Sequence, residues 1–101
     1  MTNKSEVLDQ LIKIIRTNKS KSPELSYTSA LFKKGKIKIA NKVGEESTET
    51  ITAFLSQGKN EIAEESADLI FHLFVVLEYS SDSTDDVFDV LVERMNNEKD
   101  N

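Results

Sequence analysis

The sequence contains no cysteine, a single proline and only three glycines in 101 residues. Without cysteine, the chain forms no disulfide and holds no thiolate zinc site. So little proline and glycine favours long helices joined by few turns. The single histidine also argues against a carboxylate-bridged di-iron bundle, because such bundles place Glu-x-x-His pairs on two helices.

Long apolar segments are missing as well. The N-terminus has no apolar run of the kind found in secretory signals. The longest apolar stretch, Leu69–Leu77 with His72 inside it, is about half the length that a membrane-spanning helix needs. We therefore expect a soluble, cytoplasmic protein with no membrane partner.

Basic charge is not in excess, because 18 Asp and Glu stand against 13 Lys and Arg and give a formal net charge of −5. This balance argues against a nucleic-acid partner. The lysines are nevertheless concentrated just before the first acidic motif, at Lys33, Lys34, Lys36, Lys38 and Lys42. Such a cluster suits a polyphosphate ligand, although lysines on a solvated helix face give the same pattern.

Apolar residues at helical spacing recur along the chain, without strand alternation of useful length. The pattern predicts one all-α domain, residues 1–101, in which a bundle of about five helices has two long central members that bear the acidic motifs. We expect 1–4 and 96–101 to fray. The first predicted helix begins at Ser5 and Glu6 and ends in the polar run 17–22. The next three are 27–34, capped by Ser26 and stopped by Gly35; 37–57, stopped by Gly58; and 61–79, capped by Asn60. The last begins at a capping box of Ser83 and Asp86 and extends to about Met95.

A helical wheel separates the faces of the two central helices. For 37–57, the apolar side that includes Ile51, Phe54 and Leu55 is predicted to face the core. For 61–79, the predicted core face comprises Ile62, Ser66, Leu69, Ile70, Leu73 and Leu77, yet the far side is also apolar, at Phe71, Phe74 and Val75. A helix that is apolar all round is buried on both sides. We therefore predict a homodimer, or a higher even assembly, in which a partner subunit covers this helix.

The acidic residues of these helices form two pairs, Glu46/Glu49 and Glu65/Asp68, each with i,i+3 spacing. Residues three apart lie on the same side of a helix, so two such helices packed together bring four carboxylates to one place. Like charges this close repel, and a hard divalent cation with oxygen ligands is the usual remedy. The motif predicts a site for Mg²⁺, with Mn²⁺ as a substitute.

The pattern Glu46-x-x-Glu49, fifteen residues, Glu65-x-x-Asp68 resembles the signature of the all-α nucleoside triphosphate pyrophosphohydrolases, which include the MazG-like proteins and the dimeric dUTPases. Within this superfamily, the flanking segments are similar to the phosphoribosyl-ATP pyrophosphohydrolases of histidine biosynthesis. One departure is Phe71, where that family more often has tyrosine. The resemblance implies the stand-alone form, without a fused cyclohydrolase domain. The similar segments are Ser26–Thr28, Leu31–Gly35, Lys38–Ile39, Lys42–Glu46, Ala67–Leu69 and His72–Leu73.

This resemblance implies that metal-activated water attacks the α,β-phosphoanhydride of phosphoribosyl-ATP and that phosphoribosyl-AMP and pyrophosphate are released. It makes Glu46, Glu49, Glu65 and Asp68 the metal ligands, with Glu45 and Glu49 as catalytic residues. Glu45 would orient the attacking water, unless it is an ordinary surface acid. Phosphate contacts fall to Lys42, Lys38 and Lys34. Ser26, Tyr27 and Thr28 would contact the substrate or else cap and pack their helix. His72, four residues after Asp68, would form a hydrogen bond to this metal ligand without binding the metal itself.

Two further interpretations stay open. A sibling enzyme of the same superfamily that acts on dUTP, dCTP or a damaged nucleotide would share the metal and the reaction. A non-catalytic helical dimerisation module would explain the apolar surface of 61–79, but it would not explain the acids that lie along the same helix.

Overall fold

The computed structural model describes residues 3–80 and 83–98, and within these ranges every regular element is a helix. This confirms the all-α class and the predicted number of helices for the described part of the chain. None of the helices in these ranges is both long and apolar enough to span a membrane. The elements are the 3-10 turn η1 (Lys4–Glu6) and the helices α1 (Val7–Asn18), α2 (Tyr27–Lys34), α3 (Lys36–Ser56), α4 (Lys59–Tyr79) and α5 (Ser83–Glu98).

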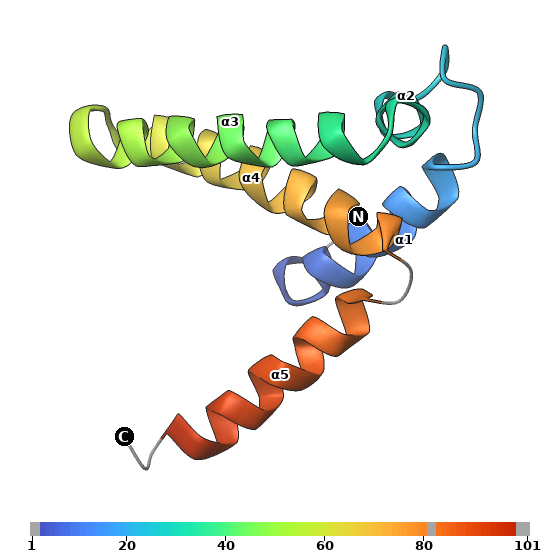
Figure 1. The fold of residues 1–101 in the computed structure, drawn as a ribbon. Helices are drawn as coiled ribbons and strands as arrows, with labels where there is room; N and C mark the ends of the chain where they lie inside the picture. The colour runs from blue at the N-terminus through green and yellow to red at the C-terminus, as the bar shows by residue number, and fades with distance from the viewer. Residues whose placement is uncertain (1–2, 81–82, 99–101) are drawn as a thin grey trace.

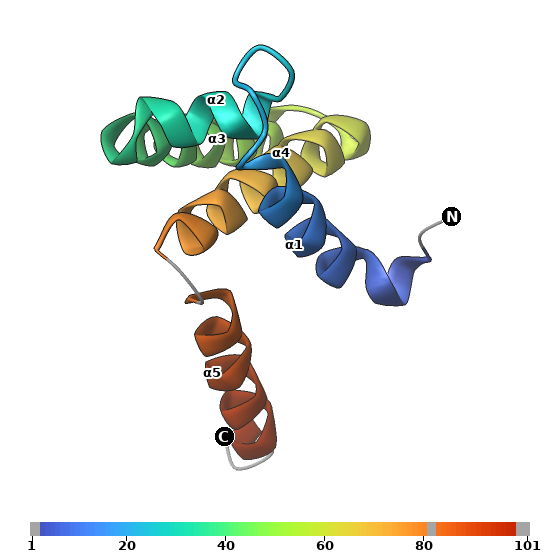
Figure 2. The same cartoon turned by 90° about the vertical axis from the view of Figure 1, so that its right-hand side faces the viewer.

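The two longest helices, α3 and α4, lie side by side as an antiparallel pair joined at Gln57 and Gly58 (Figure 1). Helix α1 packs against α4, and α2 packs against α3 near the start of that helix. Helix α5 contacts α4 near its beginning and then projects away from the other helices (Figure 2). The α3–α4 pair is therefore the scaffold on which any site built from both acidic motifs must stand.

The break between α2 and α3 follows the predicted signals. The Ser26 hydroxyl caps α2 by accepting a hydrogen bond from the Ser29 N–H at 3.1 Å. Gly35 has a φ of 98°, a conformation that glycine adopts without the clash that a Cβ would cause. The Gly35 N–H donates to the Leu31 carbonyl at 3.1 Å, so α2 stops there, and α3 begins at the next residue.

The start of α4 differs from the prediction that Asn60 is the cap. The helix begins at Lys59, with Gly58 in the cap position, and the Glu61 carboxylate accepts a hydrogen bond from the Gly58 N–H at 3.1 Å. A glutamate in the first turn stabilises a helix start by accepting from a free backbone N–H, and here the helix starts two residues earlier than predicted.

The ends of α1 and α5 can be compared with the prediction where the structure describes them. Helix α1 ends at Asn18, inside the polar run 17–22 as predicted, whereas α5 continues beyond Met95 to Glu98. The predicted capping box of Ser83 depends on a side chain outside the described set. The fraying of 1–4 and 96–101 stays a prediction, since part of each segment lies outside the described residues.

The core lies where α1, α2 and α3 meet the second half of α4. Its buried apolar side chains are Ile12, Ile15, Leu31, Ile39, Phe74 and Val75. Phe74 also contacts Phe88 of α5, with the ring centroids 6.3 Å apart, which holds the start of α5 against α4.

The predicted core faces of the two central helices are largely wrong for the single chain, although Leu77 packs against the core as predicted. On α3 the fractional exposures of Ile51, Phe54 and Leu55 are 58, 72 and 73%, and Ala53, on the opposite side, is buried. On α4 the far side packs into the core, and the predicted core face leaves Ile70 and Leu73 exposed. A helical wheel finds apolar stripes without showing what covers them. Helix α1 packs on α4, and Tyr27 of α2 contacts Phe71, on the stripe that the wheel assigned to the far side.

A buried carboxylate ties three helices together near the α4–α5 junction. Glu78 of α4 is 3% exposed and accepts hydrogen bonds from Arg16 of α1, at 2.7 Å from Nε and 3.1 Å from Nη2. The Thr84 hydroxyl of α5 donates to the same carboxylate at 2.6 Å. Burial by itself would raise the pKa of Glu78, but the hydrogen bonds from Arg16 and Thr84 outweigh it and hold the pKa below its ordinary value.

Candidate active site

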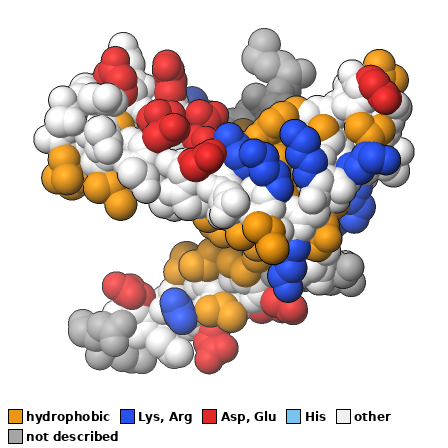
Figure 3. Space-filling model, turned by 45° about the horizontal axis from the view of Figure 1, so that its top comes forward, with side chains coloured by type: hydrophobic (Ala, Val, Ile, Leu, Met, Phe, Trp, Pro, Cys, Tyr) orange, Lys and Arg blue, Asp and Glu red, His pale blue; other side chains and the backbone are white. Residues whose placement is uncertain are grey.

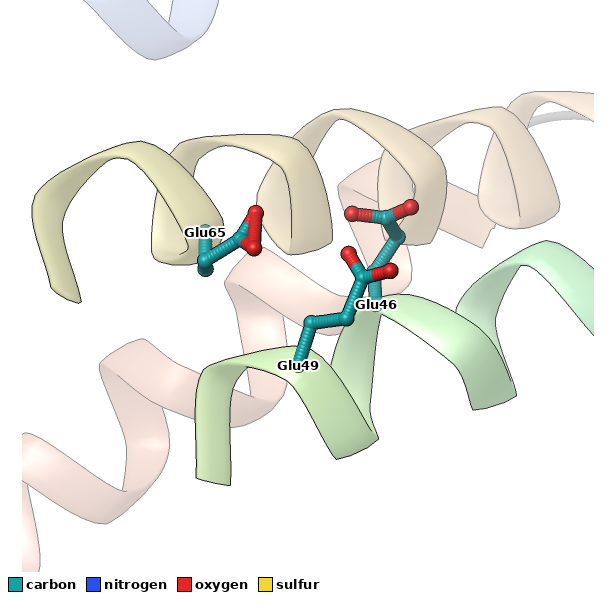
Figure 4. A group of neighbouring side chains, drawn as sticks. All are labelled: Glu46, Glu49 and Glu65. Carbon is teal, nitrogen blue, oxygen red and sulfur yellow. The ribbon is translucent and has the colours of Figure 1, made fainter. Parts of the chain in front are cut away.

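Three of the four predicted metal ligands come together between the central helices. Glu46 and Glu49 project from α3 and Glu65 from α4, and their carboxylates point toward one another (Figure 4). One carboxylate oxygen of each lies within 4.8 Å of the others. We refer to these three residues as the acidic cluster. Asp68, the fourth predicted ligand, is exposed and is not among them, although its charge acts on Glu46 and Glu65.

Glu46 is the buried member of the acidic cluster, with 6% of its surface exposed. Its Oε2 atom is buried and has no hydrogen-bond partner in the described part of the chain. Burial raises the pKa of the Glu46 carboxyl, and repulsion from Glu49 and Asp68 raises it further. Burial and the charges of Glu49 and Asp68 raise the pKa of Glu65 in the same way. The folded protein therefore holds more negative than positive charge at this place.

This arrangement fits a hard divalent cation. The donors of the acidic cluster are all carboxylate oxygens, the ligand type that Mg²⁺ and Mn²⁺ prefer. A buried carboxylate oxygen without a hydrogen bond is costly, and a coordinated cation would satisfy it. The imidazole of His72 makes other hydrogen bonds, so the set has no nitrogen donor that would favour zinc or iron.

A residue that the sequence reasoning missed fixes the register of the two helices at this point. The Thr50 hydroxyl lies 2.8 Å from the Glu46 carbonyl oxygen on its own helix and 3.1 Å from the Glu65 carbonyl oxygen on α4. It therefore holds the backbones of two members of the acidic cluster next to each other. The first contact has the i−4 spacing of Thr50 to Glu46 as a sequence signal, but the second joins residues that only the fold brings together.

Of the lysines expected to contact phosphate, Lys42 lies beside the acidic cluster, Lys38 precedes it on α3, and Lys34 ends α2. The Lys42 ammonium is 3.2 Å from Glu45 Oε2 and 3.8 Å from Glu46 Oε1. Glu45 is thus an exposed partner of Lys42 and not a member of the acidic cluster. Lys34 and Lys38 are exposed. Figure 3 shows acidic and basic side chains gathered next to each other on this face of the molecule.

The three predicted contacts on α2 have different surroundings. Ser26 caps the helix and Thr28 is buried, which are the structural roles that the sequence left open for them. Tyr27 is 54% exposed, and its hydroxyl is 2.8 Å from His72 Nε2. His72 is buried, and its Nδ1 is 2.7 Å from the backbone carbonyl oxygen of Asp68. The expected contact between His72 and Asp68 is therefore made to the main chain and not to the carboxylate.

The chain is similar to known proteins over most of its length. Residues 8–95 match the family described as phosphoribosyl-ATP pyrophosphohydrolase. A protein named phosphoribosyl-ATP pyrophosphatase from Metallosphaera sedula is 46% identical over 91 residues, which are 90% of this chain and 98% of that protein. A protein of the same name from Sulfurisphaera tokodaii is 48% identical over 91 residues, 90% of this chain and 97% of its own. The chain thus belongs to the phosphoribosyl-ATP pyrophosphohydrolase family.

Proposed function

We propose that this protein hydrolyses phosphoribosyl-ATP to phosphoribosyl-AMP and pyrophosphate, the second step of histidine biosynthesis. Membership of the family supports the proposal, as do the names of relatives that match nearly their whole length. The structural observation that carries it is the acidic cluster next to Lys42, in which a buried carboxylate oxygen of Glu46 has no hydrogen-bond partner among the described residues. We also expect the enzyme to act in the cytoplasm, where nucleotide substrates are available.

In this proposal Glu46, Glu49 and Glu65 hold Mg²⁺, or Mn²⁺ in its place, and Asp68 is the fourth ligand on the adjacent turn of α4. When bound, the cation supplies Lewis-acid chemistry, because it neutralises phosphate charge and makes water more acidic. The overall reaction adds water across the α,β-phosphoanhydride and releases phosphoribosyl-AMP and pyrophosphate. No covalent intermediate on the protein is required.

The remaining residues bind and orient the substrate in this proposal. Lys42 contacts phosphate, because Glu45 and Glu46 hold its ammonium at the edge of the acidic cluster. Lys38, one turn before Lys42 on α3, and Lys34, the last residue of α2, add positive charge for the rest of the triphosphate. Glu45 is exposed to solvent and would orient the attacking water. Glu49 is the second acid that takes part in catalysis in this proposal.

We propose in addition that the enzyme is a homodimer, or an even assembly built from dimers, through the exposed apolar face of α3 and α4. The radius of gyration is 15.2 Å, against about 13 Å for a compact domain of 100 residues. Only seven apolar side chains of the described residues are buried, and sixteen large ones are exposed. Exposed apolar surface of this extent is typical of an interaction site. Its members on the two central helices include Ile37, Ile51, Phe54, Leu55, Ile70 and Leu73.

The test of the reaction is a substrate panel scored by pyrophosphate release. Phosphoribosyl-ATP should be hydrolysed far faster than ATP, dUTP or dCTP, and EDTA should abolish turnover that Mg²⁺ then restores. Preference for dUTP or dCTP would instead identify a sibling pyrophosphohydrolase with the same cluster. Release from none of these nucleotides by folded, Mg²⁺-loaded protein would refute the proposal.

A further inference from the structure

The only histidine of the chain makes two hydrogen bonds that connect α4 to α2. The Nδ1 atom of His72 is 2.7 Å from the Asp68 carbonyl oxygen, one turn earlier on α4, and Nε2 is 2.8 Å from the Tyr27 hydroxyl. His72 is buried, and its ring stands edge-on to the rings of Tyr27 and Phe71. Both nitrogens are thus engaged in a fixed geometry.

The chemistry of the two partners determines where the protons lie. A backbone carbonyl oxygen only accepts, so the Nδ1 of His72 must bear the hydrogen that donates to Asp68. In the neutral ring Nε2 is then an acceptor, and the Tyr27 hydroxyl must donate to it. Burial of Tyr27 raises the pKa of its hydroxyl, and the charges of Glu46, Glu45 and Asp68 add to this effect while Lys42 opposes it. The phenol therefore keeps its proton at neutral pH.

A phenol has one hydrogen, and in Tyr27 that hydrogen is already committed. The oxygen of Tyr27 has only acceptor capacity left, so it repels phosphate oxygens and attracts a hydrogen-bond donor. We propose that His72 is a positioning residue that fixes the Tyr27 hydroxyl as an acceptor, and that Tyr27 binds a hydroxyl of the ribose that bears the triphosphate. The ribose contact rests on the proposed function, because that function gives the identity of the substrate. The proton arrangement of Tyr27 and His72 is independent of the proposed function.

The position of Tyr27 favours that ribose over the other donors of a nucleotide. Its hydroxyl is 2.8 Å from His72, which also hydrogen-bonds the backbone of the proposed ligand Asp68, and the charges of Lys42 and Glu46 act on it. Tyr27 therefore lies near the proposed triphosphate site. The donors nearest to a triphosphate are the 2′- and 3′-hydroxyls of the ribose to which it is attached. More than half of the surface of Tyr27 is exposed, so a ligand has access to it.

The proton arrangement is tested by NMR of the imidazole nitrogens in metal-free protein in mildly alkaline buffer. With one histidine in the chain, both ring ¹⁵N signals belong to His72, and their couplings to the ring C–H hydrogens distinguish Nδ1 from Nε2. Nδ1 should be protonated, and Tyr27→Phe should move the Nε2 signal toward that of a free acceptor. Tyr79→Phe is the matched control, because the ring of Tyr79 packs on Phe32 and not on His72. A proton on Nε2, or an Nε2 chemical shift that Tyr27→Phe leaves unchanged, overturns the proposal whether or not the enzyme hydrolyses phosphoribosyl-ATP.

The ligand is tested by a cycle of variants and substrates. Tyr27→Phe should raise KM by about 2–12-fold with a smaller change in kcat, the loss of one hydrogen bond. The 2′-deoxy or the 3′-deoxy analogue should show the same loss with wild type and no further loss with Tyr27→Phe. His72→Leu, checked for folding by its melting temperature, should also abolish the discrimination against that analogue. If removal of the 2′-hydroxyl and removal of the 3′-hydroxyl both raise KM by factors that are independent of Tyr27→Phe and multiply with its effect, the ribose contact is refuted.

Discussion

At the level of single residues, the carboxylates of the acidic cluster must be close together to hold a cation and are destabilised by the same closeness when no cation is present. Glu46 shows this most clearly, since burial and the charge of Glu49 both raise the pKa of its carboxyl. A substitution that removes one charge while keeping the size of the side chain separates the two effects.

Glu49→Gln makes that separation. Repulsion on Glu46 falls, so the metal-free variant should melt at the wild-type temperature or above it. Pyrophosphate release should nevertheless fall by about 100-fold or more, because a lost ligand misplaces the cation. The matched control is Glu64→Gln on α4, an exposed acid outside the acidic cluster, which should change neither quantity. An active Glu49→Gln enzyme would remove Glu49 from the ligand set.

Glu78 gives a pH prediction of known sign. Its pKa is lower in the folded protein than the ordinary 4.5, so its stabilisation is fully present above that value and is lost as the pH falls through the folded pKa. Glu78→Gln should therefore cost about 2 kcal/mol of unfolding free energy at neutral pH, the worth of hydrogen bonds to a charged group. Urea unfolding at fixed protein concentration should show this difference shrink below pH 4.5. A difference that is constant with pH would mean that the carboxylate charge contributes nothing.

The residue types of the site were readable from the sequence, but their partners were not. The i,i+3 spacing predicted that Glu46 and Glu49 share a side of α3, because that follows from helix geometry alone. The contact between Tyr27 and His72 joins positions 45 residues apart and depends on how α2 packs, which no local pattern encodes. The same holds for Glu46, whose burial results from the fit of α4 against α3.

At the level of elements, Thr50 provides a test of how precisely α3 and α4 must be aligned. Thr50→Val keeps the shape of the side chain but removes the hydroxyl between the Glu46 and Glu65 carbonyls. We expect a loss of about 1 kcal/mol in stability and a larger relative fall in kcat, because the ligands shift against each other. Thr48→Val is the matched control, since its hydroxyl donates to the Gly44 carbonyl on the same helix and not across to α4 within the described residues. Equal effects of the two substitutions on kcat would argue that register at Thr50 is unimportant.

The elements themselves were the most predictable part of the fold. Ser26 and Gly35 mark the ends of α2 through their own backbone chemistry, which is local and therefore visible in the sequence. The direction in which each apolar face points is not local. Helix α4 is apolar on both sides, so its periodicity is compatible with either side facing the core, and only the packing of α1 decides between them.

At the level of the whole molecule, the single chain leaves much apolar surface exposed. Its core is small, α5 projects from the other helices, and the apolar face of α3 and α4 has nothing upon it among the described residues (Figure 1). The reversed helix faces have a simple explanation in a dimer, because the stripe that the wheel assigned to the core would be buried by a second copy. The amphipathic pattern would then describe the assembly and not the subunit.

This explanation predicts the mass of the protein and the substitution that changes it. Light scattering at micromolar concentration should give at least twice the 11.4 kDa subunit mass. Phe54→Asp should lower that mass, because a charge in an apolar interface must be desolvated, whereas Phe54 is 72% exposed in the single chain and its loss costs the subunit little. Leu25→Asp is the matched control, since Leu25 is equally exposed but lies between α1 and α2. A wild-type monomer, or a Phe54→Asp variant that keeps the wild-type mass, would show that this face is not the interface.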